Sequence, residues 1–315
     1  MTVACWPAGL EDQIRSEIER LDRNQKRLQS IGDRIKALSP PTYLDYPAIC
    51  NGRLTLTSAT PVTTTDVTNA GTLYFTPFRG AMVALYNGTR WELFRFTEIS
   101  LALSVTSGTN YDVFLYESSG AVAMELTAWS GNTTRATALA LQDGIYVKSG
   151  TTTRRYVGTI RGSASNKTED SQAKRFVWNY YNRVPRDLYR TDATVSWTYT
   201  TFAWRAGNNS SSNIVEVVVG VQETWISLRI AQNISGTTGG YVGICEDCSN
   251  TYASYGDSIY GLSSMNGTVR IVAYLDKSPV PGYHYYQWTE LGLGSGSCTR
   301  YSSGQNTAFF GYIEA

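Results

Sequence analysis

The sequence contains little of what metal centres and nucleic-acid-binding surfaces require. It has one histidine, His284, which excludes a multi-histidine metal centre and leaves a single candidate for a histidine-based catalytic triad. Its 27 basic and 26 acidic residues nearly cancel, so no positive field favours nucleic acid. Charged residues make up 17% of the chain, below the usual quarter. The composition predicts neither a metal nor a nucleic-acid partner.

Long hydrophobic runs are also missing. The apolar stretches are far shorter than the roughly 18 residues of a membrane span, so we expect no membrane insertion. The segment Met1–Pro7 lacks the basic-then-apolar pattern of a signal peptide. The sequence holds no P-loop, no H-E-x-x-H and no paired C-x-x-C set, so we expect no cofactor and assign no catalytic residue. A structural or adhesive protein fits these absences best.

The residues that are abundant favour β-structure. Threonine, serine, valine and glycine are frequent, and 22 tyrosines outnumber nine phenylalanines. We predict a mainly β fold with an N-terminal α-helix that forms a trimeric coiled coil, followed by two antiparallel β-sandwich or barrel-like domains. The expected divisions are a docking peptide at 1–9, a coiled-coil helix at 10–41, and β domains at 42–188 and 189–315.

The charge is concentrated near the N-terminus, where residues 11–36 hold 13 of the 53 charged residues. Apolar residues recur there at helical, near-heptad spacing. This pattern predicts a helix from about Leu10 to Leu38, ended by Ser39-Pro40-Pro41. The predicted trimerisation residues are Ile14, Ile18, Leu21, Gln25, Leu28, Ile31 and Ile35.

Two interpretations of this helix remain open. It could be an amphipathic helix packed on its own domain, but its narrow apolar stripe with charged flanks favours a short parallel coiled coil. Isoleucine at most seam positions favours three strands. Gln25 in the seam is either a register-setting polar layer or a local defect, and Gly32 is a weak position.

Short β-type runs separated by glycine turns fill the rest of the chain. We expect strands near 53–57, 72–75, 82–86, 91–96, 111–116, 121–126 and 155–160, and a helical turn at 136–141. In the second domain we expect strands near 194–204, 214–221, 225–230, 269–275, 283–289 and 308–313. Loops are expected at 207–213, 233–240 and 292–304, and a hinge at 184–187.

Five cysteines, Cys5, Cys50, Cys245, Cys248 and Cys298, bear on redox and metal chemistry. A redox role for Cys245-x-x-Cys248 would need a helix N-terminus, and a zinc site would need a fourth ligand such as His284. We expect reduced, partly buried thiols in a protein assembled in a cytoplasm.

Aromatic residues cluster around His284. Strand alternation puts Tyr283 and Tyr285 on one face and Tyr286 and Trp288 on the other. Exposed rings of this kind stack on sugars, so these four are the candidate glycan contacts, although packing between sheets or protomers is favoured.

Two further features have a functional and a structural interpretation. Glycan cleavage needs two carboxylates at a defined separation, and Glu216, Glu223 and Glu290 are isolated in sequence, so a protomer interface would have to bring them together. The basic and aromatic stretch Lys174–Arg186 could stack on bases, but a structural junction at the end of the first β domain is favoured.

Three blocks of the sequence resemble a module of structural proteins from tailed bacteriophages. They are Arg53–Val62 running to Thr72–Pro77, Ala138–Gly144 with Lys148–Gly150, and Lys174–Pro185, which together cover about residues 50–188. The resemblance extends more loosely to 189–315 and suggests a virus of the freshwater cyanophage type. It implies a virion component, a fibre of the tail, baseplate or head, and supplies no catalytic residues.

The residues and the resemblance together predict a homotrimeric virion fibre assembled in the host cytoplasm. Its N-terminus would dock to other virion proteins, and its β domains would contact a host-surface glycan or protein or hold virion parts together. A glycan-degrading tailspike with an active site between protomers is the first alternative. A capsid decoration protein is the second.

Overall fold

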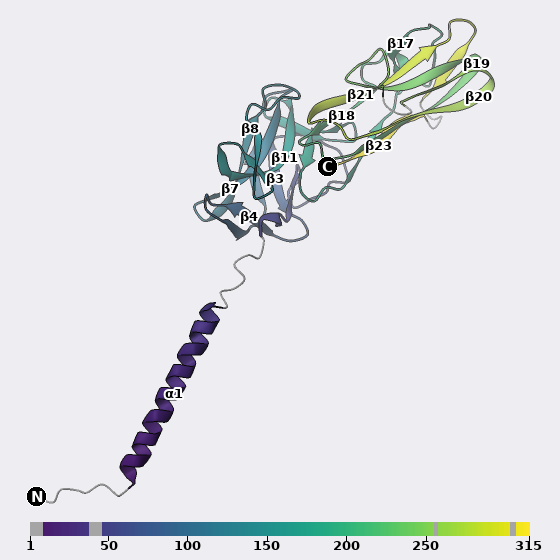
Figure 1. The fold of residues 1–315 in the computed structure, drawn as a ribbon. Coiled ribbons are helices and arrows are strands. Elements are labelled where there is room, and N and C mark those ends of the chain that lie inside the picture. The colour runs from purple at the N-terminus through teal and green to yellow at the C-terminus, as the bar shows by residue number, and fades with distance from the viewer. Residues whose placement is uncertain (1–8, 38–45, 255–257, 303–306) are drawn as a thin grey trace, which may run out of the picture. The chain divides into compact units, whose positions relative to one another are not determined.

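The computed structural model describes residues 9–37, 46–254, 258–302 and 307–315, apart from the side chains of Asp33, Ile35, Lys36, Ala37, Tyr46 and Met265. The predicted docking peptide, the helix stop at 39–41 and Cys5 lie outside the described residues. The chain divides into two compact units, Met1–Tyr46 and Pro47–Ala315. The fold is mainly β with one N-terminal α-helix, as predicted (Figure 1).

The first unit contains helix α1 (Leu10–Ala37). Glu11 and Asp12 in its first turn complement the positive end of the helix dipole. Ion pairs one turn apart, such as Lys26 with Asp22 at 2.8 Å and Arg23 with Glu19 at 3.7 Å, line its polar surface. The predicted start of the helix at Leu10 is confirmed, and the helix is described as far as Ala37, whereas its predicted end at Leu38 lies outside the described residues. In the described part of the chain, no helix is long and apolar enough to span a membrane.

The second unit begins with a short 3₁₀ turn, η1 (Tyr46–Ala48), and a group of mostly antiparallel strands. Strands β1, β3 and β6 form one sheet, β4 and β5 form a hairpin, and β11 is flanked by β7 and β14. The bounds are β1 (Gly52–Thr55), β2 (Val67–Ala70), β3 (Thr72–Pro77), β4 (Met82–Tyr86), β5 (Trp91–Arg95), β6 (Ile99–Ala102), β7 (Asn110–Ser118), β8 (Ala121–Ala128), β9 (Leu139–Gln142), β10 (Ile145–Lys148), β11 (Thr151–Ala164), β12 (Lys167–Asp170), β13 (Lys174–Arg175) and β14 (Val177–Asn179).

The remaining strands contain the longest β-ribbon of the molecule, which is made by β19 and β20. The bounds are β15 (Pro185–Arg190), β16 (Ser196–Thr198), β17 (Trp204–Ala206), η2 (Gly207–Asn209), β18 (Ile214–Val219), β19 (Ile226–Glu246), β20 (Ile259–Lys277), β21 (Gly282–Gly292), β22 (Cys298–Tyr301) and β23 (Ala308–Glu314). All of their pairings are antiparallel except that of β13 with β18, which is parallel.

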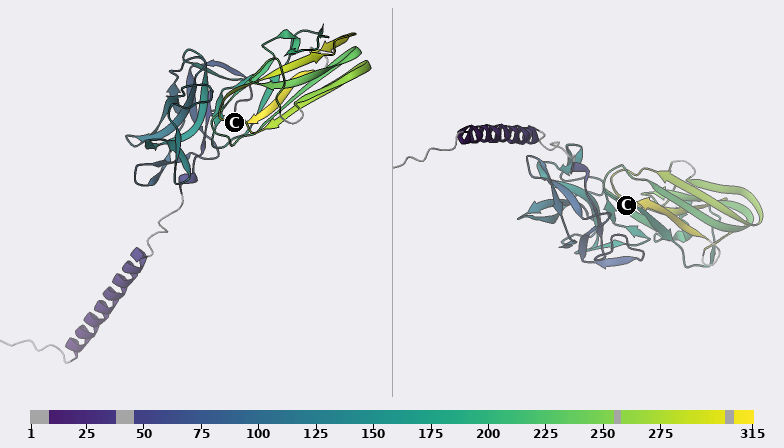
Figure 2. Two further views of the ribbon diagram at one scale, coloured as in Figure 1. Left: turned by 45° about the horizontal axis from the view of Figure 1, so that its top comes forward. Right: turned by 90° about the horizontal axis from the view of Figure 1, so that it is seen from below.

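Strand β19 changes its neighbour along its length within one sheet. Residues 226–231 pair with β23, residues 234–236 with β22, and residues 240–246 with β21. The register with β20 shifts between Gly236 and Thr238, where the ribbon bends. Figure 2 shows β19, β20 and β21 running side by side. The several sheets of the fold are compatible with a β-sandwich-like arrangement, and in the described residues they form no closed barrel.

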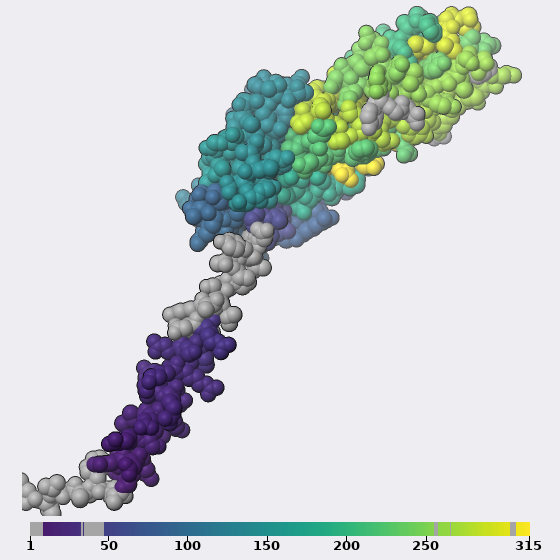
Figure 3. All heavy atoms as spheres, viewed as in Figure 1, coloured from purple at the N-terminus to yellow at the C-terminus, as the bar shows by residue number. Residues whose placement is uncertain are grey.

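Two hydrophobic clusters stabilise the second unit. One gathers residues from the early strands, such as Leu54, Phe75 and Leu115, and the other is dominated by the later strands. Successive residues of β11 serve different clusters, since Tyr156 packs in the second and Val157 in the first. Early and late strands consequently pack against each other in one body (Figure 3). The division into two β domains stays a prediction.

Four local expectations are wrong. Residues 139–141 of the expected helical turn lie in strand β9. The expected loop at 292–304 contains strand β22. The expected loop at 233–240 lies inside β19, because serine, threonine and asparagine are tolerated where β20 and β22 supply pairing partners. The expected hinge at 184–187 leads into β15, which pairs with β23 along its whole length.

Candidate functional site

The predicted seam of α1 is exposed in the single chain. The exposed fractions are 44% for Ile14, 60% for Ile18, 58% for Leu21, 69% for Leu28 and 45% for Ile31. Gln25 is exposed as well, and the side chain of Ile35 lies outside the described residues. Within its own unit, the helix thus presents an apolar stripe, interrupted at Gln25, that is left uncovered.

The candidate glycan contacts lie on β21, but two of them are unable to meet a sugar. Tyr286 and Trp288 are fully buried in the second hydrophobic cluster, so the prediction of a glycan contact is wrong for them. Tyr283 and Tyr285 are half-buried. The hydroxyl of Tyr283 donates to a carboxylate oxygen of Glu216 at 2.7 Å. The pKa of Tyr283 is raised, mainly by burial and next by this hydrogen bond.

His284 is 3% exposed and is held by two acceptors. Its Nδ1 lies 2.8 Å from a carboxylate oxygen of Asp247, and its Nε2 lies 3.0 Å from the carbonyl oxygen of Val280. Both ring nitrogens must therefore donate, which requires the charged imidazolium. Burial alone lowers the pKa of His284, but the hydrogen bond and the charge of Asp247 outweigh burial and raise it. The histidine thus links Asp247 to the backbone at Val280.

The cysteine expectation needs one correction. Cys245 and Cys248 are joined by a disulfide, whereas Cys50 and Cys298 are free and buried. Burial raises the pKa of Cys50 to about 11, so this thiol is unreactive at neutral pH. The described residues contain no group of three or more histidine, cysteine, aspartate or glutamate side chains that could hold a metal ion. The loop of the disulfide carries Asp247, the partner of His284.

Two of the candidate catalytic carboxylates, Glu216 and Glu290, lie far apart within one chain. Glu216 lies opposite Tyr285, five residues before Glu290 along β21, so the backbone positions of the two are about 17 Å apart along the strand direction and their side chains are on opposite faces. Glu290 is fully buried and is held by Arg205 at 2.8 Å and Arg300 at 3.2 Å. Glycosidase pairs are roughly 5–9.5 Å apart. This arrangement gives Glu290 a structural role.

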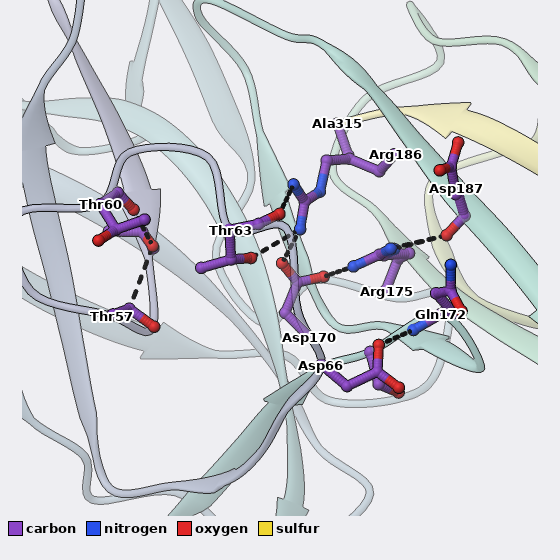
Figure 4. A network of polar contacts seen from close by, with 12 residues as sticks. Thr57, Thr60, Thr63, Asp66, Asp170, Gln172, Arg175, Arg186, Asp187 and Ala315 are labelled. Carbon is purple, nitrogen blue, oxygen red and sulfur yellow. Dashed lines mark hydrogen bonds and ion pairs between the residues drawn. The ribbon is translucent and has the colours of Figure 1, made fainter.

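The basic and aromatic stretch Lys174–Arg186 folds into the interior. The carboxylate of Asp170 bridges Arg175 at 3.0 Å and Arg186 at 2.8 Å, and Arg186 also donates to the carbonyl oxygen of Thr63 at 2.7 Å (Figure 4). Trp178 is fully buried. Because Arg175, Trp178 and Arg186 lie inside the fold, these three offer no surface for base stacking, in line with the favoured structural interpretation.

A groove of about 610 Å³ lies between segments that are far apart in sequence. Its lining combines aromatic, aliphatic and hydrogen-bonding groups. The residues are Thr133, Thr134, Arg135, Ala138, Leu139, Tyr146, Val221, Gln222, Val280 and Pro281, and we call this cavity the Tyr146 groove.

Two smaller pockets are weaker candidates for a binding site. One of about 300 Å³ lies beside Lys174, Arg190 and Glu216, where Lys174 is 3.6 Å from Glu216. The other, of about 400 Å³, lies along β20 beside Tyr260 and Tyr274. Neither combines an aromatic wall with as many converging polar groups as the Tyr146 groove.

An aromatic row crosses the outer face of the sheet formed by β20, β19, β23 and β15. Arg229 lies opposite Tyr274 on one side and Phe310 on the other, and Phe310 lies opposite Tyr189. The guanidinium carbon of Arg229 is 5.4 Å from the centre of the Tyr274 ring. Tyr189 is 44% and Tyr274 is 38% exposed. The row spans about 14 Å, since neighbouring strands lie about 4.8 Å apart.

Neither the groove nor the row was predicted. Tyr146 follows the turn Asp143-Gly144, which marks a hairpin but gives no sign that Gln222 and Val280 lie nearby. Alternation along β20 and β23 signals outward positions, such as Tyr274 and Phe310, but register across four strands is set by tertiary structure.

Comparisons with known proteins identify no family. No described protein family matches the sequence, and neither does any curated protein. Solved structures with some similarity include a glycoside hydrolase family 43 arabinoxylan arabinofuranohydrolase from Bacillus subtilis, with 12% identity, a TM-score of 0.25, and coverage of 78% of this chain and 65% of the hydrolase.

Two insecticidal proteins of Bacillus thuringiensis are similar at the same low level. The delta-endotoxin Cry8Ea1 has 7% identity and a TM-score of 0.24, and coverage is 84% of this chain and 52% of the toxin. A Cry1Da tryptic core variant has 7% identity and a TM-score of 0.21, with coverage of 85% and 53%. The chain thus spans about half to two thirds of these structures. With TM-scores of 0.25 and below, none of these similarities bears on its function.

Proposed function

We propose that the chain is a homotrimeric fibre protein of a tailed-phage virion, joined through α1 and presenting its β-rich part for attachment or assembly. The observation that carries this proposal is the exposed apolar stripe of α1, from Ile14 to Ile31. Fully burying an isoleucine or leucine side chain contributes about 1.5–3 kcal/mol. A helix obtains most of its stability from packing of such a stripe, so α1 needs a partner.

Further copies of α1 are the partner that best fits the stripe. The near-heptad spacing matches parallel helices that pack knobs into holes, and charged residues flank the seam, as in Arg15, Glu17 and Asp22. Gln25 would form a polar layer at the centre of such an assembly, where it can fix the register. Three copies would also multiply weak contacts of the β-rich units by effective concentration.

The virion assignment rests on the resemblance of residues 50–188 to tailed-phage structural proteins. A direct test is immunogold labelling of virions with antibodies against the Pro47–Ala315 unit. Label at tail, baseplate or head fibres supports the proposal. Label spread evenly over the capsid surface would instead indicate a decoration protein, and particles without label would exclude a virion role.

A further inference from the structure

The Tyr146 groove lies between elements that are held rigidly. One wall is the loop at 131–135, and the opposite wall is the turn at Val280–Pro281. The backbone amide of Tyr283 donates to the carbonyl oxygen of Asn132 at 2.9 Å, which joins the two walls. A Cβ on Gly282 would lie 2.6 Å from that oxygen, and the φ of Gly282 is +136°. Only glycine fits there, so the separation of the walls is fixed by the backbone.

An aromatic ring forms another side of the groove and is held in one orientation. The Tyr146 ring meets Tyr156 and Tyr180 edge-on, with centroids 6.5 and 5.3 Å apart. The Tyr146 hydroxyl donates to Glu223 at 3.3 Å. A half-buried tyrosine fixed in this way offers a flat apolar face with little loss of entropy on binding.

The polar groups of the groove are neutral overall. The guanidinium of Arg135 is paired with Asp112 and also donates to the carbonyl oxygen of Gly220 at 2.6 Å. Thr133 and Thr134 contribute hydroxyls, and Gln222 contributes an exposed amide that both donates and accepts. Next to the groove, the carboxylate of Glu223 lies 3.3 Å from the Tyr146 hydroxyl and disfavours an anionic ligand there, while the guanidinium of Arg183 donates to the backbone carbonyl of Glu223.

We propose that the Tyr146 groove binds a neutral oligosaccharide. One sugar face stacks on Tyr146, and the hydroxyls bond to Thr133, Thr134 and Gln222. Sugar rings have apolar C–H faces and polar edges, which match a lining that mixes Leu139 and Pro281 with hydroxyl and amide groups. The volume of about 610 Å³ lies in the usual range of small-molecule sites, about 300–1,000 Å³. The inference rests on the proposed function only in assigning this sugar to a host surface.

The test is saturation-transfer NMR and calorimetry on the full chain with three neutral tetrasaccharides, built of glucose, mannose or galactose, and with tetragalacturonate as the charged comparison. We expect at least one neutral probe to bind, and tetragalacturonate to bind about tenfold more weakly or not at all. Tyr146→Ala should weaken binding about tenfold, whereas Tyr146→Phe, which keeps the ring, should stay within about threefold of the unmodified protein.

A matched control is Tyr260→Ala, which removes a 49%-exposed tyrosine that lines no part of the groove and should leave binding unchanged. Gln222 is exposed, so Gln222→Ala should weaken binding without affecting the thermal melting temperature. This second variant keeps the inference testable if Tyr146→Ala fails to fold. Absence of binding by all neutral probes, equal loss in Tyr260→Ala, or tighter binding of tetragalacturonate would overturn the inference.

The result for sugar binding in the groove can be told apart from the result for the proposed trimeric fibre. A chain that is monomeric and still binds a neutral tetrasaccharide through Tyr146 contradicts the trimer and supports the groove. A trimer that binds none of the neutral probes contradicts the groove alone.

Discussion

Arg135 and Asp112 form a two-point ion pair at the floor of the Tyr146 groove. Nε of Arg135 lies 2.6 Å from Oδ2 of Asp112, and Nη2 lies 3.1 Å from Oδ1. The side chain of Asp112 is 2% exposed and also accepts from the hydroxyl of Thr159 at 2.8 Å. Burial raises the pKa of Asp112, and the bonds from Arg135 and Thr159 act in the opposite direction. The pair joins strand β7, which carries Asp112, to the β8–β9 connection, which carries Arg135.

Removal of one partner should destabilise the fold strongly. Arg135→Met should lower the free energy of unfolding by about 3–5 kcal/mol, because the buried carboxylate of Asp112 is then uncompensated. The double variant Arg135→Met/Asp112→Asn should lose less stability than the two single variants Arg135→Met and Asp112→Asn lose together, by at least about 1 kcal/mol. Urea unfolding of the unmodified protein, the two single variants and the double variant measures this coupling. Additive losses would show that the pair contributes no interaction of its own.

Asn179 takes the place of a neighbouring strand for Leu54. Its Oδ1 accepts from the Leu54 amide at 2.6 Å, and its Nδ2 donates to the Leu54 carbonyl at 3.2 Å. Asn179→Ala should lower the free energy of unfolding by about 2–4 kcal/mol, since two buried backbone groups lose their partner. Asn266→Ala, at an exposed position of β20, should change it by less than about 0.5 kcal/mol. Equal effects of the two substitutions would contradict this account.

The ion pair of His284 with Asp247 predicts a dependence of stability on pH. The folded-state pKa of His284 is raised, so its contribution is fully present below the unfolded pKa of about 6.5 and is lost as pH rises through the folded value. We expect about 1–2 kcal/mol from the charge-assisted bond, because the partly exposed Asp247 is screened by solvent.

The measurement compares the unmodified protein with His284→Gln in urea unfolding, from a pH below the unfolded pKa of about 6.5 to a pH above the raised folded pKa. The difference in stability should be largest at the acidic end and should shrink as pH increases. A difference that stays constant, or that grows with pH, would mean that His284 is neutral in the folded protein.

The disulfide between Cys245 and Cys248 predicts a distinct alkylation pattern. In denatured, unreduced protein the peptide with these cysteines should resist iodoacetamide, whereas Cys50 and Cys298 should react. Closing so small a loop contributes roughly 2 kcal/mol, and it also positions Asp247, so reduction should weaken the pH effect of His284. Ready alkylation of Cys245 and Cys248 before reduction would restore the expectation of free thiols.

The helix and most strands could be predicted because their signals are local. The near-heptad spacing placed the start of α1 at Leu10, and turn residues delimited strands such as β4, β7 and β8. The failures come from long-range pairing. Residues 233–240 read as a polar loop, yet β20 and β22 pair with much of this segment and make it the middle of β19.

The candidate site could not be predicted because it depends on contacts between distant segments. Alternation correctly separated Tyr283 and Tyr285 from Tyr286 and Trp288, but it does not indicate which face is buried. Two of these residues became core, and the groove formed around Tyr146 instead. The seam of α1 was visible in the sequence because one helix face is defined by spacing alone.

The central claim, that α1 joins three chains, is tested most directly by the native mass from light scattering. The account predicts about 104 kDa, three times the chain mass of 34.8 kDa. Ile18→Asn/Leu21→Asn should reduce this mass to that of one chain, whereas Ser16→Gln/Ser30→Gln, on the opposite side of the helix, should leave it unchanged. A mass near 35 kDa for the unmodified protein, or a trimer that survives the Ile18 and Leu21 substitutions, would contradict the account.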